Sequence, residues 1–112
     1  MDNTKDDRYY LKRIITDLSF ILNNTADLTS TEELESNEIL LDSVMFRLIQ
    51  ISENSNRLSA EFKEEHSGIP WHAMRGMRNR IVHDYGDVDY SVVFDTLKFD
   101  LPALLKDIEK IE

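Results

Sequence analysis

Cysteine is absent from the 112 residues, which excludes disulfide bonds and thiolate metal sites. Glycine and proline are scarce, with three and two residues, so few positions interrupt regular structure. No apolar run approaches the ~20 residues that cross a bilayer, and the polar, acidic start of the chain does not resemble a secretory signal. We therefore expect a cytoplasmic protein with a single domain over residues 1–112.

Positive charge is also in short supply, because the net charge is −9. This balance disfavours a general nucleic-acid binder, which needs clustered Lys and Arg side chains to neutralise phosphates. The segment from Trp71 to Tyr85 differs from the rest, since it holds three arginines and one acid. A basic island of this kind can contact a phosphate if the surrounding acids point elsewhere. Composition alone fits a solvated helical face better.

Apolar residues recur at steps of three and four along the chain, which is the pattern of amphipathic helices. We expect two long helices, over residues 6–24 and 37–62. The Ser30–Glu33 pair forms a capping box, so a short helical turn is expected between them. A third helix begins at Pro70, which suits a first-turn position, and runs to about residue 83.

The last part of the chain contains further helix signals. Asp89 is a good N-cap for a fourth helix, and Asp100 with Pro102 opens or kinks a final one. No segment shows the alternating pattern of a half-buried strand. The sequence therefore predicts an all-α fold, an antiparallel four-helix bundle with short additional helices.

One segment, from Arg78 to Tyr85, concentrates the reactive side chains. Arg78 carries a planar guanidinium that matches a phosphate, and His83 can exchange protons near neutral pH. Asn79 can donate to a phosphate oxygen or orient an attacking hydroxyl. Metal-free RNA cleavage needs a base for the 2′-hydroxyl, an acid for the leaving 5′-oxygen and cations around the phosphorane. A symmetric dimer would supply two histidines and two arginines for this task.

The spacing of Arg78 and His83 also allows a simpler interpretation. In a regular helix, five residues separate two side chains by ~140° around the axis and by ~7.5 Å along it. The two would meet only if the helix frays before His83 or if another subunit completes the cleft. In the simpler interpretation, Arg78 forms a surface ion pair and His83 lies at a helix C-terminus, where a cation is favoured.

The run RNRIVHDY at residues 78–85 resembles the motif of the HepT-like toxins in the HEPN superfamily, which has an arginine, four residues, a histidine, one residue and a tyrosine. Features outside the motif are also similar to that family, so the resemblance covers nearly the whole chain. These features are Glu38-Ile39-Leu40-Leu41-Asp42, Pro70-Trp71, Gly76, Val88-Asp89 and Asp100-Leu101-Pro102.

The resemblance implies a homodimer with the two motifs facing across a cleft. It implies a metal-independent RNA endonuclease that needs no cofactor and serves as the toxin of a toxin–antitoxin pair. Arg78 and His83 would be catalytic, and Asn79 would be the polar residue beside the arginine. The antitoxin of this family is a minimal nucleotidyltransferase, which can silence the toxin by attaching AMP to the motif tyrosine. The resemblance therefore implies that Tyr85 is the residue that receives AMP.

Four further side chains are candidates for a site. We expect Arg75 and Arg80 to contact RNA phosphates, because they flank the motif arginine. His66 and His72 lack a carboxylate at a spacing that would complete a metal site. We therefore expect no metal.

A second hypothesis belongs to a different class of function. The chain could be a catalytically inactive helical partner that binds a nucleotidyltransferase and a nucleotide. Its acidic charge and the spacing of Arg78 and His83 favour this hypothesis. A third hypothesis, a plain dimeric scaffold, requires the motif to occur by chance.

Overall fold

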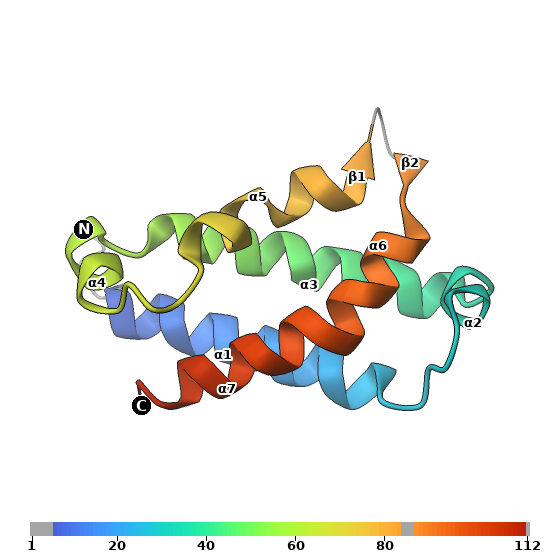
Figure 1. The fold of residues 1–112 in the computed structure, drawn as a ribbon, viewed down its shortest axis with the longest axis horizontal. Helices are drawn as coiled ribbons and strands as arrows, with labels where there is room; N and C mark the ends of the chain where they lie inside the picture. Colours follow the sequence, from blue (N-terminus) through green and yellow to red (C-terminus); the bar gives the residue numbers. More distant parts are fainter. Residues whose placement is uncertain (1–5, 84–86, 112) are drawn as a thin grey trace.

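The computed structural model describes residues 6–83 and 87–111, and these residues are mostly helical (Figure 1). The elements, in chain order, are α1 (Asp7–Thr25), α2 (Thr31–Glu35), α3 (Glu38–Arg57), α4 (Ala60–Glu65), α5 (Trp71–Ile81), β1 (Val82–His83), β2 (Asp87–Val88), α6 (Tyr90–Asp95), the π-helical turn η1 (Thr96–Asp100) and α7 (Leu101–Glu109). None of the helices in the described part of the chain is long and apolar enough to cross a membrane.

Helix α3 lies between α1 and α5, and it packs against both (Figure 1). Helix α7 packs on α1, and α6 leads into it from the β1–β2 pair through η1. The apolar stripes of these helices meet in one core, which confirms the prediction of a predominantly helical fold. The fully buried apolar side chains are Ile14, Leu18, Ile21, Leu34, Val44, Leu48, Ile51, Ile81, Val93, Leu97, Leu101 and Ile108.

Two of the predicted helix starts are confirmed by their capping bonds. The Ser30 hydroxyl accepts from the N–H of Glu33 at 3.2 Å, so α2 begins where the capping box predicts. The Asp89 carboxylate accepts from the N–H of Val92 at 3.1 Å and starts α6. Each cap satisfies a backbone donor that the first helical turn would leave unpaired.

The second long helix is shorter than predicted, since α3 ends at Arg57 instead of residue 62. Leu58 is extended, and the Ser59 hydroxyl accepts from the Phe62 N–H at 3.0 Å to start the separate helix α4. The backbone N–H and hydroxyl of Ser59 both donate to the Asp7 carboxylate at 2.7 Å. The break is therefore stabilised by a contact with the first turn of α1.

The prediction of a third helix that reaches His83 is wrong at its end. Helix α5 stops at Ile81, and Val82 and His83 form β1, which pairs antiparallel with β2. The N–H of Asp89 donates to the carbonyl of Ile81 at 3.0 Å and closes the base of this pair. The chain must reverse between the buried Ile81 and the cap of α6, and a short ladder satisfies the backbone groups there.

Candidate functional site

Helix α5 has one buried side and one exposed side. Trp71, Met74, Met77 and Ile81 face the core. The Trp71 indole N–H donates to the carbonyl of His66 at 3.0 Å, which ties the start of the helix to the preceding loop. The polar residues of the helix are exposed as a consequence; they are His72, Arg75, Arg78, Asn79 and Arg80.

The exposed residues of α5 divide between two sides of the helix. At ~100° per residue, Arg75 and Arg78 lie ~60° apart, and Asn79 is within reach of both. Arg80 lies ~200° from Arg78, on the opposite side, where it lines a groove of about 340 Å³ between α5 and α7. Arg75, Arg78 and Asn79 can therefore contact one anion together, whereas Arg80 lines the groove together with Asp100 and Phe99.

The backbone of α5 is fixed beside α3 at Arg75. Its carbonyl accepts from the Ser52 hydroxyl at 3.0 Å, and Ser52 is buried on α3. The Arg75 guanidinium lies 3.4 Å from Nδ1 of His72. Within residues 6–83 and 87–111, no carboxylate forms an ion pair with Arg75 or Arg78. Both residues are exposed, and an exposed guanidinium group can bind a phosphate.

His83 does not lie on the helix that carries Arg78. Because α5 ends at Ile81, His83 belongs to β1 and is paired with Asp87 of β2. The ~140° separation expected in a regular helix therefore does not apply, and His83 is not the C-cap of α5. The sequence analysis did not predict this strand pair. A signal for it exists, because Val82 and Val88 flank a short polar segment that contains a glycine, as in a β-hairpin. Tyr85 lies outside the described residues.

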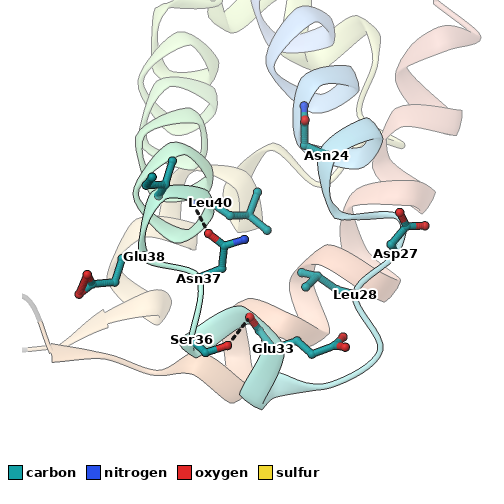
Figure 2. Close-up of a pocket in the computed structure, with 9 residues that line it drawn as sticks. Asn24, Asp27, Leu28, Glu33, Ser36, Asn37, Glu38 and Leu40 are labelled. Carbon is teal, nitrogen blue, oxygen red and sulfur yellow. Dashed lines mark hydrogen bonds between the residues drawn. The ribbon is translucent and has the colours of Figure 1, made fainter.

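A separate hollow of about 800 Å³ lies between the end of α1, α2 and the start of α3 (Figure 2). Its carboxylates come from Asp27, Glu33 and Glu38, and they would repel an RNA phosphate. The Asn37 amide oxygen in this hollow accepts from the Leu40 N–H at 3.1 Å and caps α3 (Figure 2). None of the motif residues that the structure describes lines this hollow, so the exposed side of α5 is the stronger candidate site.

Within residues 6–83 and 87–111, no group of three His, Asp or Glu side chains is placed to hold a metal ion. The residues of the candidate site are arginine, asparagine and histidine, whose combined chemistry is anion binding and proton transfer.

Comparison with known proteins identifies relatives along nearly the whole chain. The family model "Ribonuclease HepT-like" matches residues 14–111. A protein of Caldanaerobacter subterraneus subsp. tengcongensis named "Putative RNase TTE0752" is 30% identical over 107 residues, which is 96% of this chain and 95% of the relative. "Putative RNase MJ0125" of Methanocaldococcus jannaschii is 31% identical over 96% of this chain and 91% of its own length.

A further relative matches a shorter part of the chain. "Probable ribonuclease HepT" of Thermococcus cleftensis is 39% identical over 61 residues, which is 54% of this chain and 56% of the relative. No solved structure matches significantly. The family model alone covers well over half of the residues, and the chain belongs to the HepT-like ribonuclease family.

Proposed function

We propose that this chain is a metal-independent RNA endonuclease, the toxin of a toxin–antitoxin pair, and that it acts as a homodimer of single-domain four-helix-bundle subunits. One observation carries the proposal. Arg75, Arg78 and Asn79 are exposed together on α5, no carboxylate pairs with the two arginines in the described residues, and His83 follows the helix in β1. This combination supplies phosphate-binding groups and a proton carrier next to each other in the chain.

The reaction uses the substrate's own 2′-hydroxyl as the nucleophile. His83 takes the proton from this hydroxyl, and the oxygen attacks the neighbouring phosphorus. Arg78, with Asn79 beside it, stabilises the extra negative charge of the phosphorane. The bond to the 5′-oxygen then breaks, and a protonated histidine gives that oxygen a proton. The products are a 2′,3′-cyclic phosphate and a free 5′-hydroxyl.

The need for an acid and a base argues for a dimer. One subunit brings a single motif histidine, whereas two subunits related by a two-fold axis bring two. A convincing interface would bury roughly 1,200 Å² or more in total. Analytical ultracentrifugation at micromolar concentration is expected to show a dimer, and a purely monomeric species would contradict this part of the proposal.

A cleavage assay with the purified protein tests the function directly. Cleavage of a labelled RNA should continue in EDTA and should stop when the 2′-hydroxyl at the cut site is replaced by hydrogen. His83→Ala should abolish cleavage without changing the helical circular dichroism. The exposed Lys106→Ala on α7 is the control, and it should cut at the wild-type rate. If EDTA stops the reaction, or if DNA is cut equally well, the mechanism is wrong.

The second candidate function is a catalytically inactive partner that binds a nucleotidyltransferase and a nucleotide. The net charge of −9 favours it, because few basic residues are available to hold a long RNA. A pull-down with the nucleotidyltransferase together with no detectable RNA cleavage would support this candidate. The same pull-down together with cleavage sensitive to His83→Ala would support the toxin.

A further inference from the structure

His72 and Arg75 lie close together on the exposed side of α5. The Nη2 atom of Arg75 is 3.4 Å from Nδ1 of His72, which is one helical turn nearer the start of α5. A guanidinium group has donors only, so Nδ1 is the acceptor in this contact and the proton of the neutral imidazole is on Nε2. The pair therefore offers the N–H groups of Arg75 and the Nε2–H of His72 to an anion.

The backbone under this pair is held at two points. The Trp71 indole N–H donates to the carbonyl of His66 at 3.0 Å, and the Arg75 carbonyl accepts from the Ser52 hydroxyl of α3 at 3.0 Å. Glu53, which follows Ser52 on α3, forms no ion pair with Arg75 in the part of the chain that the structure describes. The pair begins in the first turn of α5, where the positive end of the helix dipole favours an anion.

A second group of donors, Arg78 and Asn79, follows on the same helix. Arg75 could join this group, but its guanidinium lies beside His72, in the opposite direction along the helix. The midpoints of the two pairs are five residues apart, which is ~7.5 Å along the helix axis. Asn79 is only ~20° from His72 around the axis, so the two pairs follow one line along the exposed side. Two donor groups in such a line suit two phosphates of one strand better than a single phosphate.

We propose that His72 and Arg75 form a second phosphate subsite, which binds a phosphate next to the one that lies at Arg78 and Asn79. The inference rests on the proposed function for its ligand, a single strand of RNA. Arg75 supplies the positive charge, and His72 supplies a neutral hydrogen-bond donor. Neither residue transfers a proton, and the subsite acts only by positioning the strand along α5.

Binding to an RNA that cannot be cut tests the subsite without cleavage. A short single-stranded 2′-O-methyl RNA has no 2′-hydroxyl to attack, and fluorescence anisotropy measures its affinity at several salt concentrations. Arg75→Ala should weaken binding about tenfold, because a hydrogen bond to a charged group is lost. It should also reduce the slope of log K against the logarithm of the salt concentration by ~0.7, the contribution of one phosphate contact in a single strand.

The histidine should behave differently from the arginine. His72→Ala should weaken binding roughly threefold, as expected for one neutral hydrogen bond. The salt slope should hardly change, because a neutral donor releases no counterion. His72→Gln should recover part of the affinity, since the side-chain amide of Gln can also donate to a phosphate.

Two control variants decide between a subsite and a general effect of charge. Lys106→Ala removes one positive charge from an exposed position on α7 and should leave affinity and slope unchanged. Arg75→Lys should restore the slope but only part of the affinity. Circular dichroism verifies that each variant is folded. If Arg75→Ala binds with the wild-type affinity and slope, or if Lys106→Ala loses as much affinity, the subsite is overturned.

A neutral methylphosphonate at one linkage of a cleavable RNA tests which phosphate the subsite binds. In the wild type, neutralising one of the two linkages beside the cut site should raise KM about tenfold and leave kcat nearly unchanged. In Arg75→Ala the same linkage should matter much less, since its contact is already lost. If Arg75→Ala lowers kcat as strongly as Arg78→Ala, Arg75 acts on the phosphate that is cleaved and the inference is wrong.

These measurements separate the subsite from the proposed function. If the wild type binds the 2′-O-methyl RNA with the expected differences among the variants but cuts no RNA, the ribonuclease proposal fails and the subsite stands. If the wild type cuts RNA and the His72 and Arg75 variants bind and cut as it does, the subsite fails and the ribonuclease proposal stands. A wild type that binds no single-stranded RNA overturns the subsite, whatever the cleavage assay shows.

Discussion

Asp17 and Arg47 join α1 to α3 through an ion pair in which Nη1 lies 2.7 Å from Oδ1. The Asp17 side chain is only 3% exposed, and its second oxygen has no hydrogen-bond partner among the described residues. The guanidinium carbon of Arg47 also lies 3.9 Å from the centre of the Phe20 ring. Arg47 is therefore the charged partner of a nearly buried carboxylate.

Replacing Arg47 should strongly destabilise the fold. Arg47→Ala leaves the Asp17 charge buried without its partner, which costs about 3 kcal/mol or more of unfolding free energy. Arg47→Lys should cost less, because it retains the charge but loses the planar stacking on Phe20. Urea denaturation measures both losses. Arg13→Ala, at an exposed position of α1, is the control; equal midpoints for Arg13→Ala and Arg47→Ala would contradict the prediction.

Glu33 should make stability depend on pH. The backbone N–H and the hydroxyl of Thr29 donate to its Oε1 at 2.7 and 3.0 Å, which lowers the pKa of Glu33 below its usual value of 4.5. Folding thus favours the ionised form of Glu33. The stability that this carboxylate gives the folded state is fully present above the pKa of Glu33 in the unfolded chain, and it is lost as the pH falls through the lower pKa in the folded protein. At pH 6 the urea midpoint of the wild type should be higher than that of Glu33→Gln. The difference between the two midpoints should be smaller at pH 3.

The control for Glu33 lies on the same short helix. Glu35 accepts no hydrogen bond in the portion of the chain that the structure describes, so the gap between wild type and Glu35→Gln should not narrow in the same way. If the difference in urea midpoint between wild type and Glu33→Gln stays constant from pH 6 to pH 3, the hydrogen bonds from Thr29 do not make stability depend on pH.

Local signals in the sequence predict the helices well because their causes are local. The caps at Ser30 and Asp89 act within three residues, and the apolar stripes have a helical period. The break at Ser59 has a different cause. Its partner, Asp7, is 52 residues away, and periodicity continues smoothly past the break, so no local pattern reveals it. Tertiary contacts override helix propensity at such points.

The candidate site is predictable in its residue types but not in its geometry. The exposure of Arg75 and Arg78 follows from the apolar stripe of α5, and the helical period alone is sufficient to separate Arg80 from Arg78. The end of α5 before His83 is not predictable in this way. Two-residue strands are too short to produce a recognisable alternation, so the register with Asp87 emerges only from the structure.

Gly76 offers a test of what approaches the exposed side of α5. A Cβ at this position would meet no described atom within 4 Å, so Gly76→Ala should raise the unfolding free energy of the subunit by about 0.5–1 kcal/mol. In the proposed dimer, the same methyl group would crowd whatever packs there. Urea denaturation should show the gain, and ultracentrifugation should show weaker association. Stronger association would contradict a close approach at Gly76.

Arg78 and Arg80 should differ sharply in their contribution to cleavage. Arg78→Ala should reduce the single-turnover rate by about 10²-fold or more, because a preorganised donor to the phosphorane is lost. Arg78→Lys should recover only part of the rate, since a point charge cannot reproduce the guanidinium fork. Arg80→Ala should have a much smaller effect, because Arg80 lies on the groove side of α5. Equal losses for Arg78→Ala and Arg80→Ala would contradict this division.

Tyr85 should be the point at which an antitoxin silences the protein. A nucleotidyltransferase partner would transfer AMP from ATP to the Tyr85 hydroxyl and release pyrophosphate. The attached phosphodiester is negative, so it would compete with an RNA phosphate for Arg78, and the adenosine would add bulk two residues after His83 in the sequence. Incubation with the partner and ATP should therefore add AMP to the protein, which mass spectrometry detects, and should stop cleavage.

Two tyrosine variants test the position of the modification. Tyr85→Phe should accept no AMP and keep cutting in the presence of the partner, whereas the control Tyr90→Phe should still be modified and silenced. Modification at another residue, or an AMP-bearing protein that cuts at the unmodified rate, would remove this mode of control.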